Sequence, residues 1–121
     1  MTITQTVTLN FTPELINEIV DGIMANFPEA SYGGALRCVG WKYDEREFQF
    51  EDLEDEIIYT VGADDFNKAF PLLFTDKWPK GCTQPPASVD SAVWEDWLCQ
   101  SDAEDFDAFA QLVCLGEVIY G

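Results

Sequence analysis

The sequence contains no histidine, and only six of its 121 residues are lysine or arginine. Without histidine, neither a Ser-His-Asp nor a Cys-His arrangement for nucleophilic catalysis can form. The scarcity of positive side chains disfavours direct binding to nucleic acid or to an anionic membrane surface, because both of these partners require a basic patch. We therefore expect a protein that binds neither partner directly.

Several other signals are missing. The glycines of "YGGAL" lack the lysine and the spacing of a phosphate-binding loop. No apolar run approaches the about 20 residues of a membrane span, and "MTITQTVTLNF" has neither the basic region nor the apolar core of a signal peptide. We therefore predict a cytoplasmic protein.

The four cysteines also fit no metal motif. No pair has CxxC spacing, which disfavours a structural zinc site, and in a chain without a leader scattered cysteines are more often reduced thiols, although two disulfides stay open as an alternative. Carboxylates are so numerous that no pair of them stands out as a catalytic acid and base, and "DAEDFD" at 102–107 imitates a calcium loop only loosely. The sequence thus predicts no enzyme, no metal and no cofactor. The cysteines are Cys38, Cys82, Cys99 and Cys114.

The apolar content predicts a packed interior. Hydrophobic residues make up 47% of the chain and aromatic residues 14%, enough for one domain over residues 1–121. Period-two alternation predicts strands over residues 3–11 and within 32–44, 46–52 and 56–62, the last three as an antiparallel meander. Of the residues in the second of these strands, Leu36, Cys38 (or Val39) and Trp41 are candidates for the inner face, and Trp41 and Trp94 are expected in the core.

Helical periodicity alternates with these strands. A helix is predicted from Pro13 to Phe27 with Thr12 as its cap, and another over 63–78 that Pro71 kinks or shortens. After a Pro-rich loop over 79–91, two helices are predicted, the first capped by Asp90 or Ser91 and the second by Ser101 or Asp102. This order predicts an α+β fold in which a small antiparallel sheet of three to four strands packs against three to four helices.

Negative charge is the most unusual feature. The chain has 23 Asp and Glu residues and a net charge of −17, and its carboxylates gather in two clusters. Strand residues two apart share a face about 6.6 Å apart, and a nucleic acid strand has a phosphate about every 3.4 Å, so carboxylates on a hairpin and on helix starts can imitate a phosphate track. The first cluster is Asp44, Glu45, Glu47, Glu51, Asp52, Glu54, Asp55 and Glu56; the second is Asp90, Glu95, Asp96, Asp102, Glu104, Asp105 and Asp107.

We predict a partner-binding surface from these clusters. Trp78 and Trp97 lie close to the second cluster in the sequence, and aromatic residues beside acids make plausible contact anchors. The alternative is a solvated face that serves only solubility, but −17 exceeds the magnitude of about 2–8 that solubility usually requires. The predicted surface comprises the whole first cluster together with Glu95, Asp96, Asp102, Glu104, Asp105, Trp78 and Trp97.

The C-terminal sequence resembles the ending of a family of small phage and mobile-element proteins. Members of that family end in an acidic segment, a glutamine, an apolar pair, "FGE", two β-branched residues and "YG", and Leu115 stands here where the family has phenylalanine. "LNFTPELINEIVDGIMA" and "VGWKYDEREFQFEDLEDE" are similar to its first helix and following hairpin. The matching residues of the ending are Gln111, Leu112, Gly116, Glu117, Val118, Ile119, Tyr120 and Gly121.

The resemblance implies a phage or plasmid origin and no assigned activity. In charge and size the chain also resembles anti-restriction and anti-CRISPR inhibitors that imitate nucleic acid. The function expected from charge and resemblance together is an inhibitor that occupies the basic nucleic-acid-binding surface of a host defence protein. Two alternatives stay open: an oligomeric sponge for a nucleotide signal, and a structural protein of a virion or plasmid. A homodimer is also left open.

Overall fold

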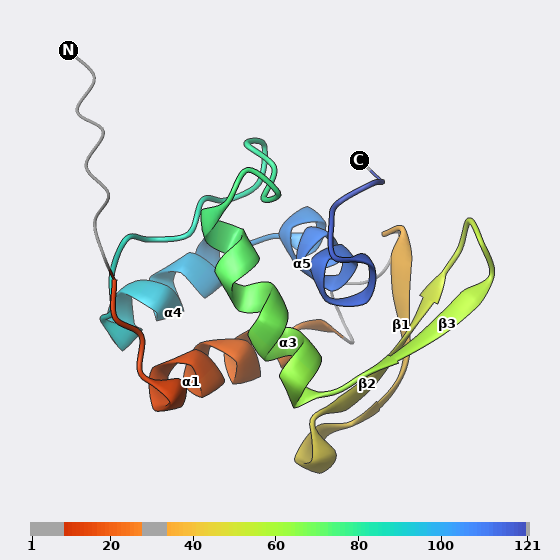
Figure 1. Ribbon diagram of the computed structural model, residues 1–121, viewed down its shortest axis with the longest axis horizontal. Helices are drawn as coiled ribbons and strands as arrows, with labels where there is room; N and C mark the ends of the chain where they lie inside the picture. The colour runs from red at the N-terminus through yellow and green to blue at the C-terminus, as the bar shows by residue number, and fades with distance from the viewer. Residues whose placement is uncertain (1–8, 28–33, 121) are drawn as a thin grey trace.

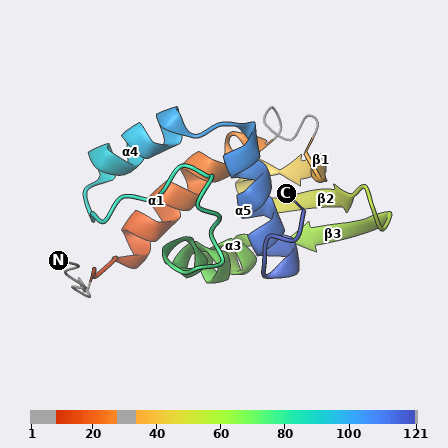
Figure 2. The same cartoon turned by 90° about the horizontal axis from the view of Figure 1, so that it is seen from above.

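The protein is an α+β fold in which helices cover one face of a three-stranded sheet (Figures 1 and 2). The computed structural model describes residues 9–27 and 34–120. Within these ranges the chain forms the helices α1 (Pro13–Met24), α3 (Ala63–Ala69), α4 (Ser91–Gln100) and α5 (Ala103–Leu115). The strands are β1 (Leu36–Lys42), β2 (Glu47–Asp52) and β3 (Ile57–Val61). The predicted fold class is confirmed.

The sheet is the predicted antiparallel meander, with β2 between β1 and β3. A short 3-10 helix, η1 (Tyr43–Glu45), joins β1 to β2, and residues 53–56 form the turn between β2 and β3. Arg46 and Glu56, which stand directly before β2 and β3, have positive φ angles of 53° and 57°. Residues other than glycine rarely adopt this backbone conformation, so both corners of the meander carry backbone strain.

The helices begin where the sequence predicts. The Thr12 hydroxyl accepts a hydrogen bond from the Leu15 N–H, and Pro13 occupies the first turn of α1. Asp90 caps α4 through the Ala92 N–H, and Asp102 caps α5 through the Asp105 N–H. After α3 the chain tightens into a second 3-10 helix, η2 (Phe70–Phe74). Pro71 has no N–H to continue an α-helical ladder, and the predicted shortening is confirmed.

The core lies between the sheet and the helices. Phe27, which is fully buried, has ring centroids within 6.5 Å of five other rings. α5 packs on β1 and β3, α3 packs on β3, and α1 joins α3 to α4, which lies farthest from the sheet (Figure 1). The rings around Phe27 come from β2, α3 and α5: Phe48, Phe50, Phe66, Phe106 and Phe109.

Two sequence expectations need correction or lie partly outside the described residues. The predicted strand over residues 3–11 lies largely outside the described residues, and residues 9–11 are not strand. Trp41 was expected in the core but is 53% exposed, whereas Trp94 is buried as expected. Trp41 pairs with Phe48 across the sheet and so faces the helical side, but it lies on an edge strand beyond a bulge between Cys38 and Gly40. Its position at the border of the sheet leaves its ring uncovered.

Candidate protein-binding surface

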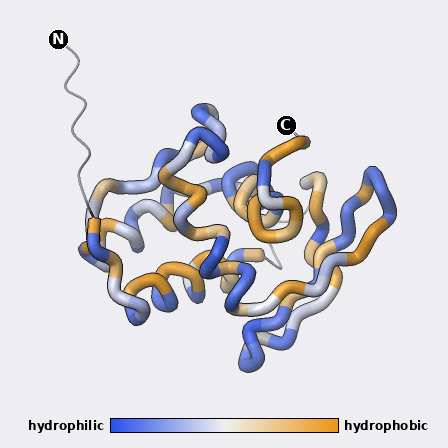
Figure 3. Tube along the Cα trace, in the orientation of Figure 1, coloured by the Kyte–Doolittle hydropathy of each residue, from blue (hydrophilic) through white to orange (hydrophobic). Residues whose placement is uncertain are grey.

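The turn between β2 and β3 presents the densest exposed negative charge of the hairpin. Glu54, Asp55 and Glu56 are all exposed at the end of the sheet that extends past the helices (Figure 1). Three large apolar side chains flank them: Leu53, Ile57 and Ile58 are 49%, 46% and 58% exposed. Figure 3 shows this change from a hydrophilic turn to a hydrophobic β3. We call residues 53–58 the hairpin tip.

Asp52 holds the hairpin tip in shape and is not part of its surface. The residue is fully buried, and Oδ1 accepts hydrogen bonds from the N–H groups of Glu54 at 2.9 Å and Asp55 at 3.2 Å. Its Oδ2 accepts the hydroxyl of Tyr120 at 3.0 Å. The prediction that Asp52 contacts a partner is therefore wrong. The buried carboxylate accepts the backbone N–H groups of the turn from the inner side. The side chains of Glu54, Asp55 and Glu56 are left on the outer side.

The remaining carboxylates of the first cluster do not continue the charge of the tip as a uniform track. Glu47 and Glu51 are half-buried on β2, and their cross-strand partners on β1 are Lys42 and Arg37. Opposite charges that face each other across a strand pair offset one another. Cations therefore interrupt the track that the sequence predicts over residues 44–56.

The exposed residues Asp44 and Glu45 lie at the other end of β2 from the tip. Lys42 lies 3.9 Å from Glu45, and Arg46 binds Asp21 of α1 at 2.9 Å. The positive charges near η1 therefore reduce the local negative field there. Of the first cluster, the tip residues Glu54, Asp55 and Glu56 are the best placed for contact with a partner.

The second cluster contains another structural carboxylate. Asp105 is 3% exposed, and its oxygens accept the Thr83 N–H at 2.8 Å, the Thr83 hydroxyl at 2.7 Å and the Asp102 N–H at 3.0 Å. Its predicted contact with a partner is wrong, because these bonds occupy it in fastening the 79–91 loop to α5. Asp102 and Glu104, by contrast, are exposed as predicted.

The two tryptophans predicted as contact anchors are also structural. Trp78 and Trp97 are 3% and 5% exposed, and both indole N–H groups donate to the carbonyl oxygen of Thr83 at 3.1 Å. A buried indole needs such an acceptor, and here one carbonyl serves two rings. The prediction of exposed anchors is therefore wrong. Sequence proximity to acids did not distinguish a surface aromatic residue from one that packs beneath the loop.

The two clusters do not merge into one surface. Glu95 and Asp96 are exposed on α4, which lies at the opposite end of the molecule from the hairpin tip in both views (Figures 1 and 2). A partner that covers the tip therefore does not reach α4 in the same contact. The structure does not bring the two acidic clusters together, and it buries Trp78 and Trp97 instead of exposing them beside surface acids.

Sequence reasoning did not identify the hydrogen bonds by which Gln111 holds the C-terminal segment against the rest of the fold. Gln111 is 1% exposed, and its Oε1 accepts the N–H groups of Ile119 at 3.0 Å and Tyr120 at 2.9 Å, while its Nε2 donates to the Tyr120 carbonyl at 3.0 Å. Burial, the hydrogen bond to Asp52 and the charges of Asp55 and Glu54 raise the pKa of Tyr120 to about 12. The polar glutamine in an apolar helix was the signal for this tie.

Each of the four cysteines lies in the described part of the chain, and none is in a disulfide. Burial raises the pKa of Cys82 and of Cys114 to about 12, and neighbouring carboxylates, chiefly Asp105 beside Cys82 and Asp65 beside Cys114, add to the effect. Cys99 is exposed on α4. Only the thiolate attacks thiol reagents, so these two half-buried groups, whose pKa is raised, should react slowly.

We therefore expect a disulfide reagent at about pH 8 to label Cys99 first, with Cys82 and Cys114 slower by about one to two orders of magnitude, because their smaller thiolate fraction outweighs the greater nucleophilicity of a high-pKa thiolate. Stopped-flow absorbance measures the phases. A Cys99→Ser variant should lack the fast phase, and a fast phase that survives this change would contradict the assignment.

The described residues contain no group of three or more side chains that could hold a metal ion. In the same part of the chain, no helix is both long and apolar enough to cross a bilayer. Comparisons with protein-family models, curated proteins and solved structures found no match for this chain. The resemblance to phage and mobile-element proteins therefore stays a prediction.

Proposed function

We propose that this protein is an acidic, non-enzymatic inhibitor that docks its hairpin tip on the basic nucleic-acid-binding surface of another protein. The observation that carries the proposal is the tip itself, where Glu54, Asp55 and Glu56 stand exposed between exposed Leu53, Ile57 and Ile58. Contact regions combine such apolar anchors with charge that complements the partner. The host cytoplasm and a phage or plasmid origin belong to the same proposal.

The net charge of −17 supports this choice of partner. Long-range attraction between an acidic protein and a basic groove accelerates their encounter, and high salt weakens it. Burial of the apolar side chains at the tip then slows dissociation, because this term does not depend on salt. The mimicry needs only the tip to enter a groove that otherwise holds phosphates.

The nucleotide sponge is a weaker candidate. A phosphate-bearing ligand requires cationic side chains in its pocket. Two hollows among the described residues, one beside α5 and one beside Phe70, are lined without lysine or arginine. No specific observation favours a structural role in a virion or plasmid.

Charge reversal at the tip tests the proposal. The probe is a panel of purified restriction and CRISPR-type nucleases, each bound to fluorescent duplex DNA or guide RNA, and the readout is displacement of the nucleic acid. Replacing Glu54, Asp55 and Glu56 with lysine should weaken displacement about 100-fold, since each reversal in a contact surface costs about 1 kcal/mol. Displacement by the unaltered protein should fall steeply as salt rises.

The control carries the same change in net charge at the far end of the molecule. Glu18, Glu95 and Asp96 are exposed on α1 and α4, and replacing these three with lysine should weaken displacement less than about fivefold. If the two triple variants lose the same amount of displacement activity, the activity depends on net charge and not on the hairpin tip. If the unaltered protein displaces nucleic acid from no member of the panel, the mimicry proposal is wrong.

A further inference from the structure

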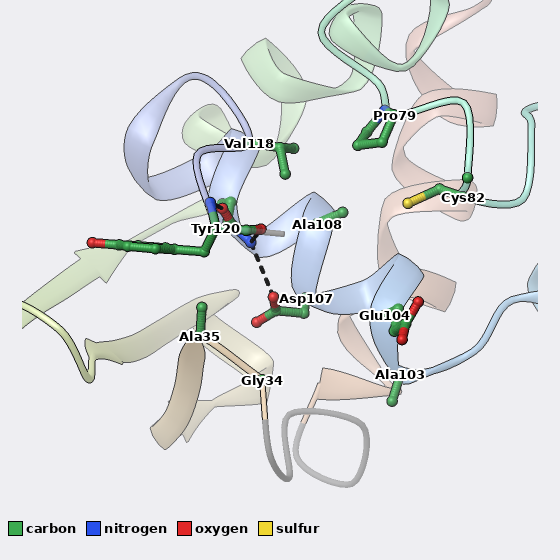
Figure 4. Close-up of a pocket in the computed structure, with 12 residues that line it drawn as sticks. Gly34, Ala35, Pro79, Cys82, Ala103, Glu104, Asp107, Ala108, Val118 and Tyr120 are labelled. Carbon is green, nitrogen blue, oxygen red and sulfur yellow. Dashed lines mark hydrogen bonds between the residues drawn. The ribbon is translucent and has the colours of Figure 1, made fainter.

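A hollow of about 560 Å3 lies beside α5. Three segments that are distant in sequence form its walls: residues 34–35, the 79–82 loop and the stretch from α5 to Tyr120 (Figure 4). Pro79 and Cys82 face it from the loop, and Glu104 and Asp107 line it from α5. The hollow is thus a place where a ligand contacts three parts of the fold at once.

The walls are mostly small and apolar, with charge of one sign. Gly34, Ala35, Gly81, Ala103 and Ala108 leave the space open, and the Cys82 thiol keeps its proton because burial raises its pKa. Among the described lining residues the charged groups are two carboxylates, and no lysine or arginine is present. An anionic ligand would meet repulsion here, whereas a cation on an aliphatic stem fits both the charge and the walls.

The two carboxylates are arranged for a planar cation with several donors. Glu104 and Asp107 lie three residues apart on one helix, which places their Cβ atoms about 5–6 Å apart on the same face. Asp107 is fixed by the Leu36 N–H and the Gln111 amide, each at 3.0 Å. A carboxylate accepts about four hydrogen bonds, so Asp107 retains acceptor capacity. A guanidinium, with five N–H donors in a rigid fork, can bond both carboxylates at once, whereas an ammonium offers three donors on a single nitrogen.

We propose that this pocket receives an arginine side chain of a partner protein. The inference deepens the proposed function and rests on it for the source of the arginine, since a basic nucleic-acid-binding surface is rich in this residue. The aliphatic stem lies against the alanine and glycine walls while the guanidinium meets Glu104 and Asp107. A free amino acid would bring its own carboxylate to an acidic rim that has no cation among the described lining residues. The site therefore selects arginine within a polypeptide.

Titration of the full chain with N-acetyl-arginine amide, followed by backbone amide NMR shifts, tests the pocket without any partner. We expect shifts at the N–H groups of Gly81, Ala103, Glu104 and Asp107, with a dissociation constant of about 1 mM for so small a ligand. N-acetyl-citrulline amide has the same shape without the charge and should bind at least about fivefold more weakly. Free arginine should also bind more weakly than the amide.

Glu104→Gln is the informative variant, because this exposed side chain keeps its shape and loses its charge. Affinity for the arginine probe should fall about threefold, a modest value for an exposed charge. Glu95→Gln on α4 is the matched control and should leave the affinity unchanged. Equal binding of the citrulline probe, or no effect of Glu104→Gln, would overturn the guanidinium assignment, and equal binding of free arginine would overturn the protein source.

The outcomes separate the two proposals. If the protein binds the arginine probe but displaces nucleic acid from no nuclease, the pocket assignment stands and the proposed inhibitor function is wrong. If the protein displaces nucleic acid through its hairpin tip but shows no NMR shifts with the probe, the proposed function stands and the pocket assignment is wrong.

Discussion

Replacing Asp105 with alanine should lower the free energy of unfolding by about 3–5 kcal/mol, because buried donors would lose a charged acceptor. Asp105 accepts three hydrogen bonds, two of them from Thr83. Thr83 in turn supplies the acceptor for the indoles of Trp78 and Trp97. The loss should therefore loosen the 79–91 loop and its packing on α4 and α5.

Urea unfolding, followed by circular dichroism and by tryptophan fluorescence, measures this change. The neighbouring Glu104→Ala variant is the control, since this side chain is exposed, and its effect should stay within about 0.5 kcal/mol. A double-mutant cycle with Thr83→Val should give a coupling energy above about 1 kcal/mol. If the Asp105 and Glu104 variants are equally stable, Asp105 does not fasten the loop.

Replacing Gln111 with leucine should cost about 2–4 kcal/mol, the second large effect. Leucine nearly preserves the volume but removes every polar partner of the Ile119 and Tyr120 backbone that the glutamine supplies. Once the segment detaches, Tyr120 should also lose its bond to Asp52. Its pKa, about 12 in the intact fold, should then return toward the ordinary value of about 10.

Thermal unfolding measures the change in stability, and tyrosinate absorbance as a function of pH measures the change in the pKa of Tyr120. Gln100→Leu is the matched control, because Gln100 is exposed at the end of α4 and the same replacement there should be nearly neutral. Tyr120→Phe removes only the bond to Asp52 and should lower the stability less than Gln111→Leu does. A Gln111→Leu protein whose Tyr120 still titrates near pH 12 would show that the tie does not depend on the glutamine.

The elements of the fold were predictable because their signals are local. Alternation identified the meander, and Thr12, Asp90 and Asp102 marked helix starts within a few residues of the bonds they accept. Gly116, with a φ of +77°, ends α5 in the left-handed conformation that glycine tolerates. The exposure of Trp41 could not be predicted from local sequence, because it depends on how far the helices extend over the sheet.

The candidate surface was only partly predictable, because identical carboxylates serve opposite purposes. Asp52 and Asp55 stand three residues apart in one acidic run, yet one is buried and the other exposed. What separates them is a hydrogen bond to Tyr120, 68 residues away. Thr83 lies 22 residues from Asp105. Composition could indicate that charge is in excess, but only the tertiary partners show which charges are used internally.

The two left-handed corners of the meander differ in what their side chains do. Glycine would relieve about 1 kcal/mol of strain at either corner. At Arg46 the side chain offsets the backbone strain, because its guanidinium bonds Asn17 and Asp21 and so connects the sheet to α1. For the Glu56 carboxylate no hydrogen bond or ion pair is found within residues 9–27 and 34–120. Glycine should therefore be tolerated better at position 56 than at position 46, where it would also remove the bonds of the guanidinium.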